Sequence, residues 1–391
     1  MSASAKNVHA FAAVLTLEEP AVIEIKEVQR SLPSPRPTLD FHEIPALDGF
    51  RGMAILCVII GHLLEFHSGS AEIRGIARSV AQTGVLLFFV LSGFLITGVL
   101  SRERNILGKV HLKDFYIRRV LRLAPALLLF LSTALLLMRS ELITDVPKKE
   151  LLECLFYARN FFGRSLSLSH IWSLSLEEQF YMIWPLTFSL LPMKRCAAMA
   201  GASCVLLATW RGAAISGNLF SYETGVFYMR PYFRFDSILI GAAVVLWLVN
   251  SPRAADKLRS VLSTIPCMVL WAALGAWTAI GESLSRTMYL TIQEFLCAAV
   301  LAQVVLCDQT KVTAFFGSRW LRYLGAISYS LYLWQQLFLV TYTPSWGPLR
   351  ELPLSVILPI AIAITSYHIM EKPLLRLKDR LAPQTSRSVG R

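Results

Sequence analysis

Charged residues are scarce in this sequence, and its cysteines form no pattern that defines a metal or disulfide site. Only 16% of the 391 residues are charged, whereas soluble domains carry about 25%. The mean hydropathy is +0.53, which excludes an ordinary soluble domain. The seven cysteines contain no CxxC pair, and an odd number cannot all be paired in disulfide bonds. We therefore expect a polytopic membrane protein with no metal site.

Other signals are also missing. No short apolar region followed by a cleavage site opens the chain, so no removable signal peptide is predicted and insertion should rely on the first span. No internal repeat is evident, which disfavours a transporter built from repeated halves. The net charge of +12 is not gathered into one basic stripe but alternates with apolar segments, so nucleic-acid binding is not expected.

What the sequence does contain is a series of apolar spans. A helix of about 20 apolar residues crosses the hydrocarbon of a bilayer. The ten predicted spans are 47–66, 82–100, 120–138, 174–192, 196–211, 232–249, 261–280, 287–306, 324–342 and 353–371. Pro185, Pro266 and Pro359 lie inside spans and predict kinks. The predicted fold class is all-α, a polytopic membrane helical bundle of about ten helices.

The distribution of lysine and arginine orients this bundle. With the N-terminus inside, twelve of the 38 basic residues fall in outer connections and the other 26 in inner ones. Cytoplasmic loops are the ones enriched in basic residues, so both termini are predicted to be cytoplasmic. The predicted parts are a mostly disordered N-terminal tail (1–43), a transmembrane domain (44–373) and a basic C-terminal tail (374–391).

The chain is organised around its first span, which has an arginine at its mouth and a histidine inside. Arg51 and His62 are eleven residues apart, which is roughly 16 Å along a helix. If Arg51 marks one membrane face, His62 lies near the middle of the bilayer. An ionisable side chain at that depth is expensive and predicts a functional site; the alternative is a histidine that only packs between helices.

A basic segment leads into the third span. Arg119 and Arg122 are three residues apart and share a helix face, while Arg118 is offset from that face. Such a cluster can simply hold the topology or touch anionic lipid. It can also bind phosphates, because guanidinium groups match phosphate oxygens. Coenzyme A, with phosphates at one end and a thiol at the other, suits an arginine patch with a histidine deeper in the membrane.

Several motifs in a fixed order resemble the acyltransferase-3 family of bacterial multi-pass membrane O-acyltransferases. The resemblance covers residues 44–373. The motifs are Leu47-Asp48-Gly49-Phe50-Arg51-Gly52 with His62, and the segments 88–96, 115–125, 172–181, 234–241, 328–334 and 371–373. The resemblance implies transfer of an acyl group, usually acetyl, from cytoplasmic acyl-CoA to a hydroxyl of a sugar or related acceptor, in the bacterial cytoplasmic (inner) membrane.

This resemblance assigns roles to particular residues. The family's arginine and histidine fall on Arg51 and His62, and its acidic residue falls on Glu177. Its arginine motif falls on Arg118, Arg119 and Arg122, which are the predicted acyl-CoA site. In one respect the chain departs from the pattern: many members carry histidine after Tyr-Leu-Trp, and here the residue is Gln335.

The residues suggest a mechanism for such a transfer. A neutral His62 can take the proton of an acceptor hydroxyl as general base. Glu177 can orient its imidazole, although Glu177 can also be a carboxylate at a helix N-terminus. Arg51 neutralises phosphate or pairs with Asp48, since a guanidinium keeps its proton. Asp48 is a catalytic candidate or a helix cap.

Other polar residues have mainly structural interpretations. Ser173 or Ser175 is expected to cap the fourth span rather than act as a nucleophile. Arg234 and Asp236 form a structural ion pair or contribute to the acceptor pocket, and the former is favoured. Glu371 is expected at the inner membrane interface.

The sequence is compatible with more than one acceptor and with more than one class of function. The acceptor is a glycan or glycolipid such as exopolysaccharide, lipopolysaccharide or lipo-oligosaccharide, or a macrolide-type small molecule. The alternatives to an enzyme are a proton-coupled glycolipid transporter or flippase that uses His62 and Glu177, and a non-catalytic partner in polysaccharide export whose arginines bind lipid. The sequence does not set an oligomeric state.

Overall fold

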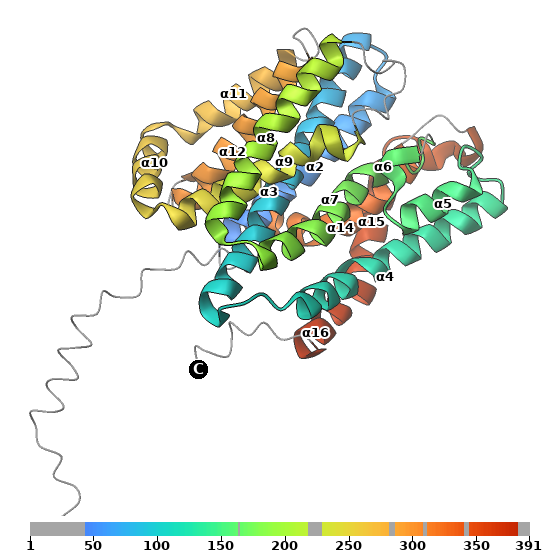
Figure 1. Ribbon diagram of the computed structural model, residues 1–391. Coiled ribbons are helices and arrows are strands. Elements are labelled where there is room, and N and C mark those ends of the chain that lie inside the picture. The colour runs from blue at the N-terminus through green and yellow to red at the C-terminus, as the bar shows by residue number, and fades with distance from the viewer. Residues whose placement is uncertain are drawn as a thin grey trace, which may run out of the picture. The chain divides into compact units, whose positions relative to one another are not determined.

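The computed structural model describes residues 44–162, 165–217, 229–280, 286–307, 311–339 and 344–381, and these ranges contain helices and no strand. The predicted tail 1–43 and residues 382–391 of the predicted C-terminal tail lie outside the described residues. The helices, shown in Figure 1, are α2 (Pro45–His67), α3 (Ala71–Leu107), α4 (Leu112–Arg139), α5 (Lys148–Leu155), α6 (Arg159–Phe162), α7 (Ile171–Leu190), α8 (Met193–Ser216), α9 (Pro231–Asn250), α10 (Pro252–Thr264), α11 (Cys267–Ile280), α12 (Arg286–Leu306), α13 (Lys311–Phe316), α14 (Arg319–Leu339), η3 (Pro344–Arg350), α15 (Leu354–Ser366), η4 (Tyr367–Glu371) and α16 (Lys372–Leu381).

Within the described ranges, seven segments are long and apolar enough to cross a membrane. They are α2, α3, α4, α8, α9, the Met288–Leu306 part of α12, and the Leu354–Arg376 segment that begins with α15. Helices α10 and α11 supply an eighth if they are counted as one broken span, because they meet at 81°. The break lies at Ile265 and Pro266, where proline cannot donate a helical hydrogen bond and holds the preceding residue extended, as the sequence predicts.

The remaining two predicted spans, 174–192 and 324–342, correspond to α7 and α14. Both helices are long, but both carry strongly polar side chains that lower their hydropathy. These are Glu177, Glu178, Gln179, Gln335 and Gln336. Their polar residues face other helices, as described below.

The connection between the first two predicted spans is mostly helical. Helix α3 begins at Ala71 and runs for 37 residues, so Arg74 and Arg78, which the charge count places outside the membrane, lie on its first turns. The side chain of Ser70 accepts a hydrogen bond from the Ile73 amide at 3.4 Å and caps the helix start. A helix of this length is about 55 Å long, well beyond the hydrocarbon thickness. The connection to α2 is only three residues long, 68–70, which makes the two helices antiparallel.

Helices α2 and α14 are packed so closely that glycine is required between them. A Cβ atom on Gly325 would overlap the carbonyl oxygen of Asp48, and one on Gly52 would lie 3.2 Å from the amide nitrogen of Gly325. Ten residues beyond this contact, His62 of α2 meets Gln335 of α14. The Gly52–Gly325 contact and the His62–Gln335 contact each join residues 273 positions apart. Because this separation stays the same along both helices, α2 and α14 run parallel. The glycine contact thus sets the register that brings His62 to Gln335.

We expect Gly325→Val to destabilise the bundle. Overpacking a well-packed contact costs about 1–3 kcal/mol, and here the obstacle is backbone that cannot rotate away. Gly201→Val in α8 is the matched control, because a Cβ on Gly201 meets nothing within 4 Å. Thermal unfolding of the purified proteins in one detergent should show a lower Tm for Gly325→Val only. Equal Tm values for the two variants would contradict the close contact.

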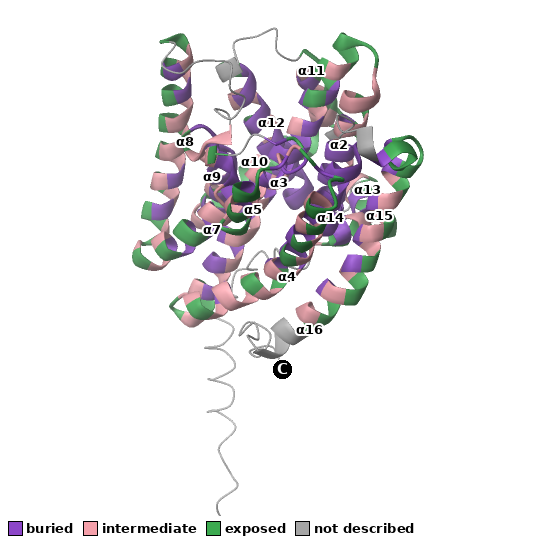
Figure 2. Ribbon diagram, turned by 90° about the vertical axis from the view of Figure 1, so that its right-hand side faces the viewer, coloured by how far each residue is buried: buried purple, intermediate pink, exposed green. Residues whose placement is uncertain are grey.

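Buried residues concentrate in the middle of the bundle, on α2, α3, α9 and α12, whereas α8 presents much of its surface outward (Figure 2). The outward faces remain apolar: Leu136 of α4, Ile183 of α7 and Leu206 of α8 are all exposed. Exposed apolar side chains on several long helices are what a lipid-facing surface requires. Helix α4 lies on the far side of the bundle from α8, α10 and α12 (Figure 1).

Candidate active site

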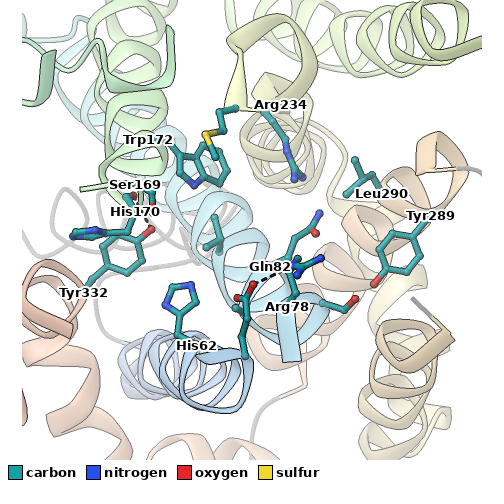
Figure 3. A pocket seen from close by; sticks show the side chains of 15 residues that line it. His62, Arg78, Gln82, Ser169, His170, Trp172, Arg234, Tyr289, Leu290 and Tyr332 are labelled. Carbon is teal, nitrogen blue, oxygen red and sulfur yellow. Dashed lines mark hydrogen bonds and ion pairs between the residues drawn. The ribbon is translucent and has the colours of Figure 1, made fainter. Parts of the chain in front are cut away.

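His62 lies at the edge of a cavity of about 380 Å³. Figure 3 shows its imidazole beside the ring of Tyr332 on one side of this cavity, with Arg234 and Tyr289 on other sides. The Nδ1 atom of His62 lies 3.0 Å from Oε1 of Gln335. The ring is therefore held between helices and next to a cavity rather than directed into lipid. Cavities of this size are large enough for small ligands.

The wall next to His62 is fixed by hydrogen bonds. The Tyr332 hydroxyl lies 2.6 Å from Oγ of Ser173 and donates to the carbonyl of His170 at 3.0 Å. His170 in turn lies 3.1 Å from the Leu333 carbonyl through Nε2. These contacts tie the start of α7 to α14, so the cavity wall needs no ligand to form.

The opposite wall is polar. Arg78 of α3 donates to Glu65 of α2 at 3.0 Å, and both line the cavity. Arg234 of α9 lines it as well, with its guanidinium 5.9 Å from the ring of Trp172. Aromatic faces beside charged and hydrogen-bonding groups can hold a polar ligand with apolar faces, as sugars have.

A second group of charged residues gathers around the first turns of α2. Arg51 lies 3.6 Å from Asp48, one turn away on the same helix. Glu177 of α7 accepts a hydrogen bond from Ser92 of α3 at 2.7 Å, and the charges of Arg119 and Arg51 both act on its carboxylate. The structure thus brings together α2, α3, α4 and α7 at this point.

The three arginines of the predicted acyl-CoA site, all on α4, have different surroundings. Arg119 forms an ion pair with Glu178, and its guanidinium lies 3.3 Å from the centre of the Tyr181 ring. Arg122 is exposed, and the charges of Arg51 and Arg119 act on it. Arg118 is partly exposed and forms no ion pair with the described part of the chain. Of these three arginines, Arg119 is the one that forms an ion pair within the described part of the chain, and Arg118 and Arg122 form none there.

The structure does not bring all the predicted residues to one point. Asp48, Arg51, Arg119, Arg122 and Glu177 share one neighbourhood, whereas His62 lies further along α2 with the cavity. The hydrogen bond that Glu177 makes is with Ser92, and the side chain on the His62 ring is Gln335. The interpretation of Glu177 as the group that orients His62 therefore has no support among the described contacts.

Gln335 was not singled out as a site residue by the sequence motifs. The available signal was the pair Gln335-Gln336 inside an apolar span, since two amides are costly in a membrane unless they are hydrogen-bonded. Glu178 was missed for a different reason. It follows Glu177 directly, and the motif alone does not show that the second carboxylate is the one that pairs with Arg119.

The surroundings of Asp236 and Glu371 add detail to the structural interpretations. Asp236 forms an ion pair with Arg211 of α8 at 2.8 Å, and the charge of Arg234, which lines the cavity, also acts on Asp236. Glu371, which was expected at the inner membrane interface, is buried within the protein and accepts a hydrogen bond from Ser330.

The expected serine cap of α7 is wrong. The helix begins at Ile171, before both serines. The hydroxyl of Ser175 donates to the Ile171 carbonyl at 3.0 Å, inside the helix. Ser173, described above, contacts Tyr332 instead of an amide at the helix start.

Comparison with known proteins identifies the family. The family model described as an Acyltransferase domain, that of acyltransferase-3, matches residues 44–368. The chain is 30% identical over 363 residues to "Putative peptidoglycan O-acetyltransferase YrhL" of Bacillus subtilis (strain 168), covering 85% of this chain and 55% of YrhL. It is 27% identical over 362 residues to "O-acetyltransferase OatA" of Staphylococcus aureus (strain NCTC 8325 / PS 47), covering 85% of this chain and 57% of OatA.

The chain thus spans somewhat more than half the length of these curated relatives. No solved structure matches it significantly. The matched region begins with α2 and contains the arginine cluster, the cavity and His62, so the match covers the whole candidate site. Together with the set of apolar helices, these findings identify the protein as an integral membrane protein of the acyltransferase-3 family.

Proposed function

We propose that this protein is an O-acetyltransferase that moves an acetyl group from acetyl-CoA to a hydroxyl of a glycan. The observation that carries the proposal is the placement of two sites on one helix. Helix α2 has Arg51, near exposed Arg122, at one end and His62, beside a cavity, eleven residues further on. A donor with phosphates at one end and a thioester at the other requires such a separation.

The donor would enter from the cytoplasm. In the proposed topology, ten spans with both termini inside place Arg51 and the arginines of α4 at the cytoplasmic face, with residues 1–43 and 374–391 as cytoplasmic tails and residues 44–373 as the transferase domain. The parallel course of α2 and α14, the first and ninth spans, supports this, since odd-numbered spans all run in one direction. Arg122 and Arg118 would contact the phosphates of the donor.

The chemistry follows from the position of His62. A neutral imidazole accepts the proton of the acceptor hydroxyl while the oxygen attacks the thioester carbonyl carbon. The tetrahedral intermediate then collapses, the carbon–sulfur bond breaks, and the new ester forms. The leaving thiolate takes the proton back from His62, which returns to its neutral form. Glu177, Asp48 and Arg51 would act at the donor end, where they set the local charge.

The acceptor would occupy the cavity. The cavity is lined by the rings of Trp172, Tyr289 and Tyr332, which can lie against the faces of a sugar. Arg78 and Glu65, which also line it, can form hydrogen bonds with the sugar hydroxyls. YrhL is named for peptidoglycan, and we extend the same acceptor class, a cell-envelope glycan, to this chain. The enzyme would act in the bacterial cytoplasmic membrane, on a glycan or its lipid-linked precursor.

Radiolabelled acetyl-CoA tests the proposal. Purified full-length protein in lipid nanodiscs should release free CoA and label a soluble peptidoglycan fragment or other glycan acceptor, and the release should depend on both protein and acceptor. The same protein in sealed vesicles distinguishes the transporter alternative. Proton-coupled uptake of glycolipid without any thioester cleavage would contradict the enzyme assignment and support a transporter.

A further inference from the structure

We infer that Gln335 and Gln336 form a hydrogen-bonded relay that fixes the tautomer of His62, with the proton on Nδ1 and the lone pair on Nε2. The inference rests on the proposed role of His62 as general base. It goes beyond that role by naming two positioning residues, one of them at the position where this chain departs from the family pattern. The two glutamines are consecutive in α14, and Gln336 reaches from there to the segment before α7.

The relay begins at an atom with only one possible role. The Leu166 carbonyl can only accept a hydrogen bond, so the Gln336 side-chain atom that lies 3.1 Å from it must be the amide nitrogen Nε2. The same nitrogen lies 3.2 Å from Oγ of Ser169. Reversing the Gln336 amide would place two oxygens against each other. Its Oε1 is therefore fixed on the side of Gln335.

The second step transfers this orientation to Gln335. Oε1 of Gln336 can only accept, and the atom facing it at 3.2 Å is Nε2 of Gln335. Oε1 of Gln335 must then be the atom facing His62, where it lies 3.0 Å from Nδ1. Because this oxygen also only accepts, Nδ1 must carry the hydrogen. A neutral imidazole has one N–H, so Nε2 keeps the lone pair that a general base needs.

Burial prevents the two glutamines from exchanging these hydrogen bonds for bonds to water. Gln335 is 0% exposed and Gln336 is 2% exposed, so no bulk water can replace a lost partner. Leaving a buried amide unpaired costs about 1–3 kcal/mol, which exceeds the small preference between imidazole tautomers. Many members of the family carry histidine at position 335, and a ring there could donate or accept. The anchored amide of this chain presents only an acceptor.

Charged and titratable groups from several elements line the cavity beside His62. They are Glu65 on its own helix, His170 before α7, Arg78 on α3, Arg234 on α9, Tyr289 on α12 and Tyr332 on α14. The hydrogen bond to the His62 ring comes from none of these groups. Substitutions at Gln335 and Gln336 therefore change the relay without removing any charge from the cavity.

Two substitutions remove the relay, and a third keeps only its hydrogen bond to His62. Gln335→Leu deletes the acceptor on Nδ1, and Gln336→Leu deletes the anchor that orients Gln335. Both should lower kcat for acetyl transfer by about 10–100-fold, the cost typical of losing a partner that orients a catalytic group, with the acetyl-CoA KM unchanged. Gln335→Glu keeps an oxygen on Nδ1 but loses the donor to Oε1 of Gln336, so at alkaline pH it should retain more turnover than Gln335→Leu.

The pH profile separates positioning from a general packing role. A carboxylate at position 335 favours the imidazolium form, so the acidic limb of kcat for Gln335→Glu should move to higher pH by about one unit or more. Gln303→Leu is the matched control, because Gln303 is a buried glutamine of α12 that donates to the Leu262 and Ile265 carbonyls. This control should leave the profile unchanged.

The outcomes distinguish the relay from the proposed function. The relay alone would be overturned if Gln335→Leu and Gln336→Leu kept the wild-type kcat and pH profile while His62→Ala was inactive. Full activity in His62→Ala would overturn the general base itself. If Gln335→Leu does not fold, as judged by its Tm, the profile of Gln335→Glu still decides: an unshifted acidic limb contradicts the relay.

Discussion

His62→Ala is expected to lower kcat for acetyl transfer by about 10²–10⁴-fold, the range that a general base contributes. The reason is positional as well as chemical. His62 lies beside the cavity proposed for the acceptor, and its Nδ1 is engaged by Gln335, so Nε2 is the nitrogen left for the acceptor hydroxyl. The KM for acetyl-CoA should change little, because the proposed phosphate contact Arg122 of α4 lies near Arg51, which is eleven residues from His62 along α2.

His67→Ala is the matched control for this experiment. His67 lies five residues further along the same helix, and its ring contacts the carbonyls of Leu63 and Arg350, each at 3.1 Å. It should therefore retain most of the transfer activity. The measurement is release of CoA from labelled acetyl-CoA, with the Tm of each variant to verify folding. Equal turnover in the two variants would remove His62 from the mechanism.

Arg119→Leu is expected to destabilise the protein strongly. The Arg119 and Glu178 side chains are 16% and 14% exposed, and losing one partner of a largely buried ion pair costs about 3 kcal/mol because the other charge is left without compensation. The double variant Arg119→Leu/Glu178→Leu removes both charges and should recover much of the lost stability. Thermal unfolding of the single and double variants measures this. A single variant as stable as the wild type would contradict a structural role.

Arg122→Ala should behave in the opposite way. Arg122 is exposed and beside Arg51, and it forms no ion pair within the described part of the chain, so removing it breaks no close ion pair. A lost charge-assisted contact to phosphate of about 1.5–3 kcal/mol corresponds to roughly a tenfold to hundredfold rise in the KM for acetyl-CoA. The Tm and kcat should stay close to wild type. An unchanged donor KM would assign the cluster to topology or lipid binding instead.

The α4 arginines show where sequence reasoning reaches its limit. The family resemblance assigned Arg118, Arg119 and Arg122 one shared role, and helical spacing placed Arg119 and Arg122 on one face. The structure separates them: Arg119 pairs with Glu178 of α7, while Arg122 remains exposed near Arg51 of α2. Helical spacing predicts the direction of a side chain but not which neighbouring helix it meets. The same limit explains why Glu177 was paired with His62 rather than with Ser92.

The glutamines show a second limit. An apolar span with Gln335-Gln336 was recognisable in the sequence, and so was the departure from the usual family pattern. Their partners, however, come from Leu166, Ser169 and His62, all distant in the chain. A hydrogen-bond direction follows only when every atom along the relay has been placed. Nothing local to position 335 distinguishes an amide that orients a base from one that simply fills a helix contact.

The sequence by itself determined the class of this protein: membrane-spanning helices, a family signature over most of the chain, and an arginine and a histidine on one helix. These properties are local, since hydropathy and helical spacing depend only on near neighbours in the chain. Only the tertiary structure decided which polar groups meet. The parallel packing of α2 and α14 through Gly52 and Gly325 joins residues 273 positions apart, and that contact placed Gln335, rather than Glu177, on the imidazole.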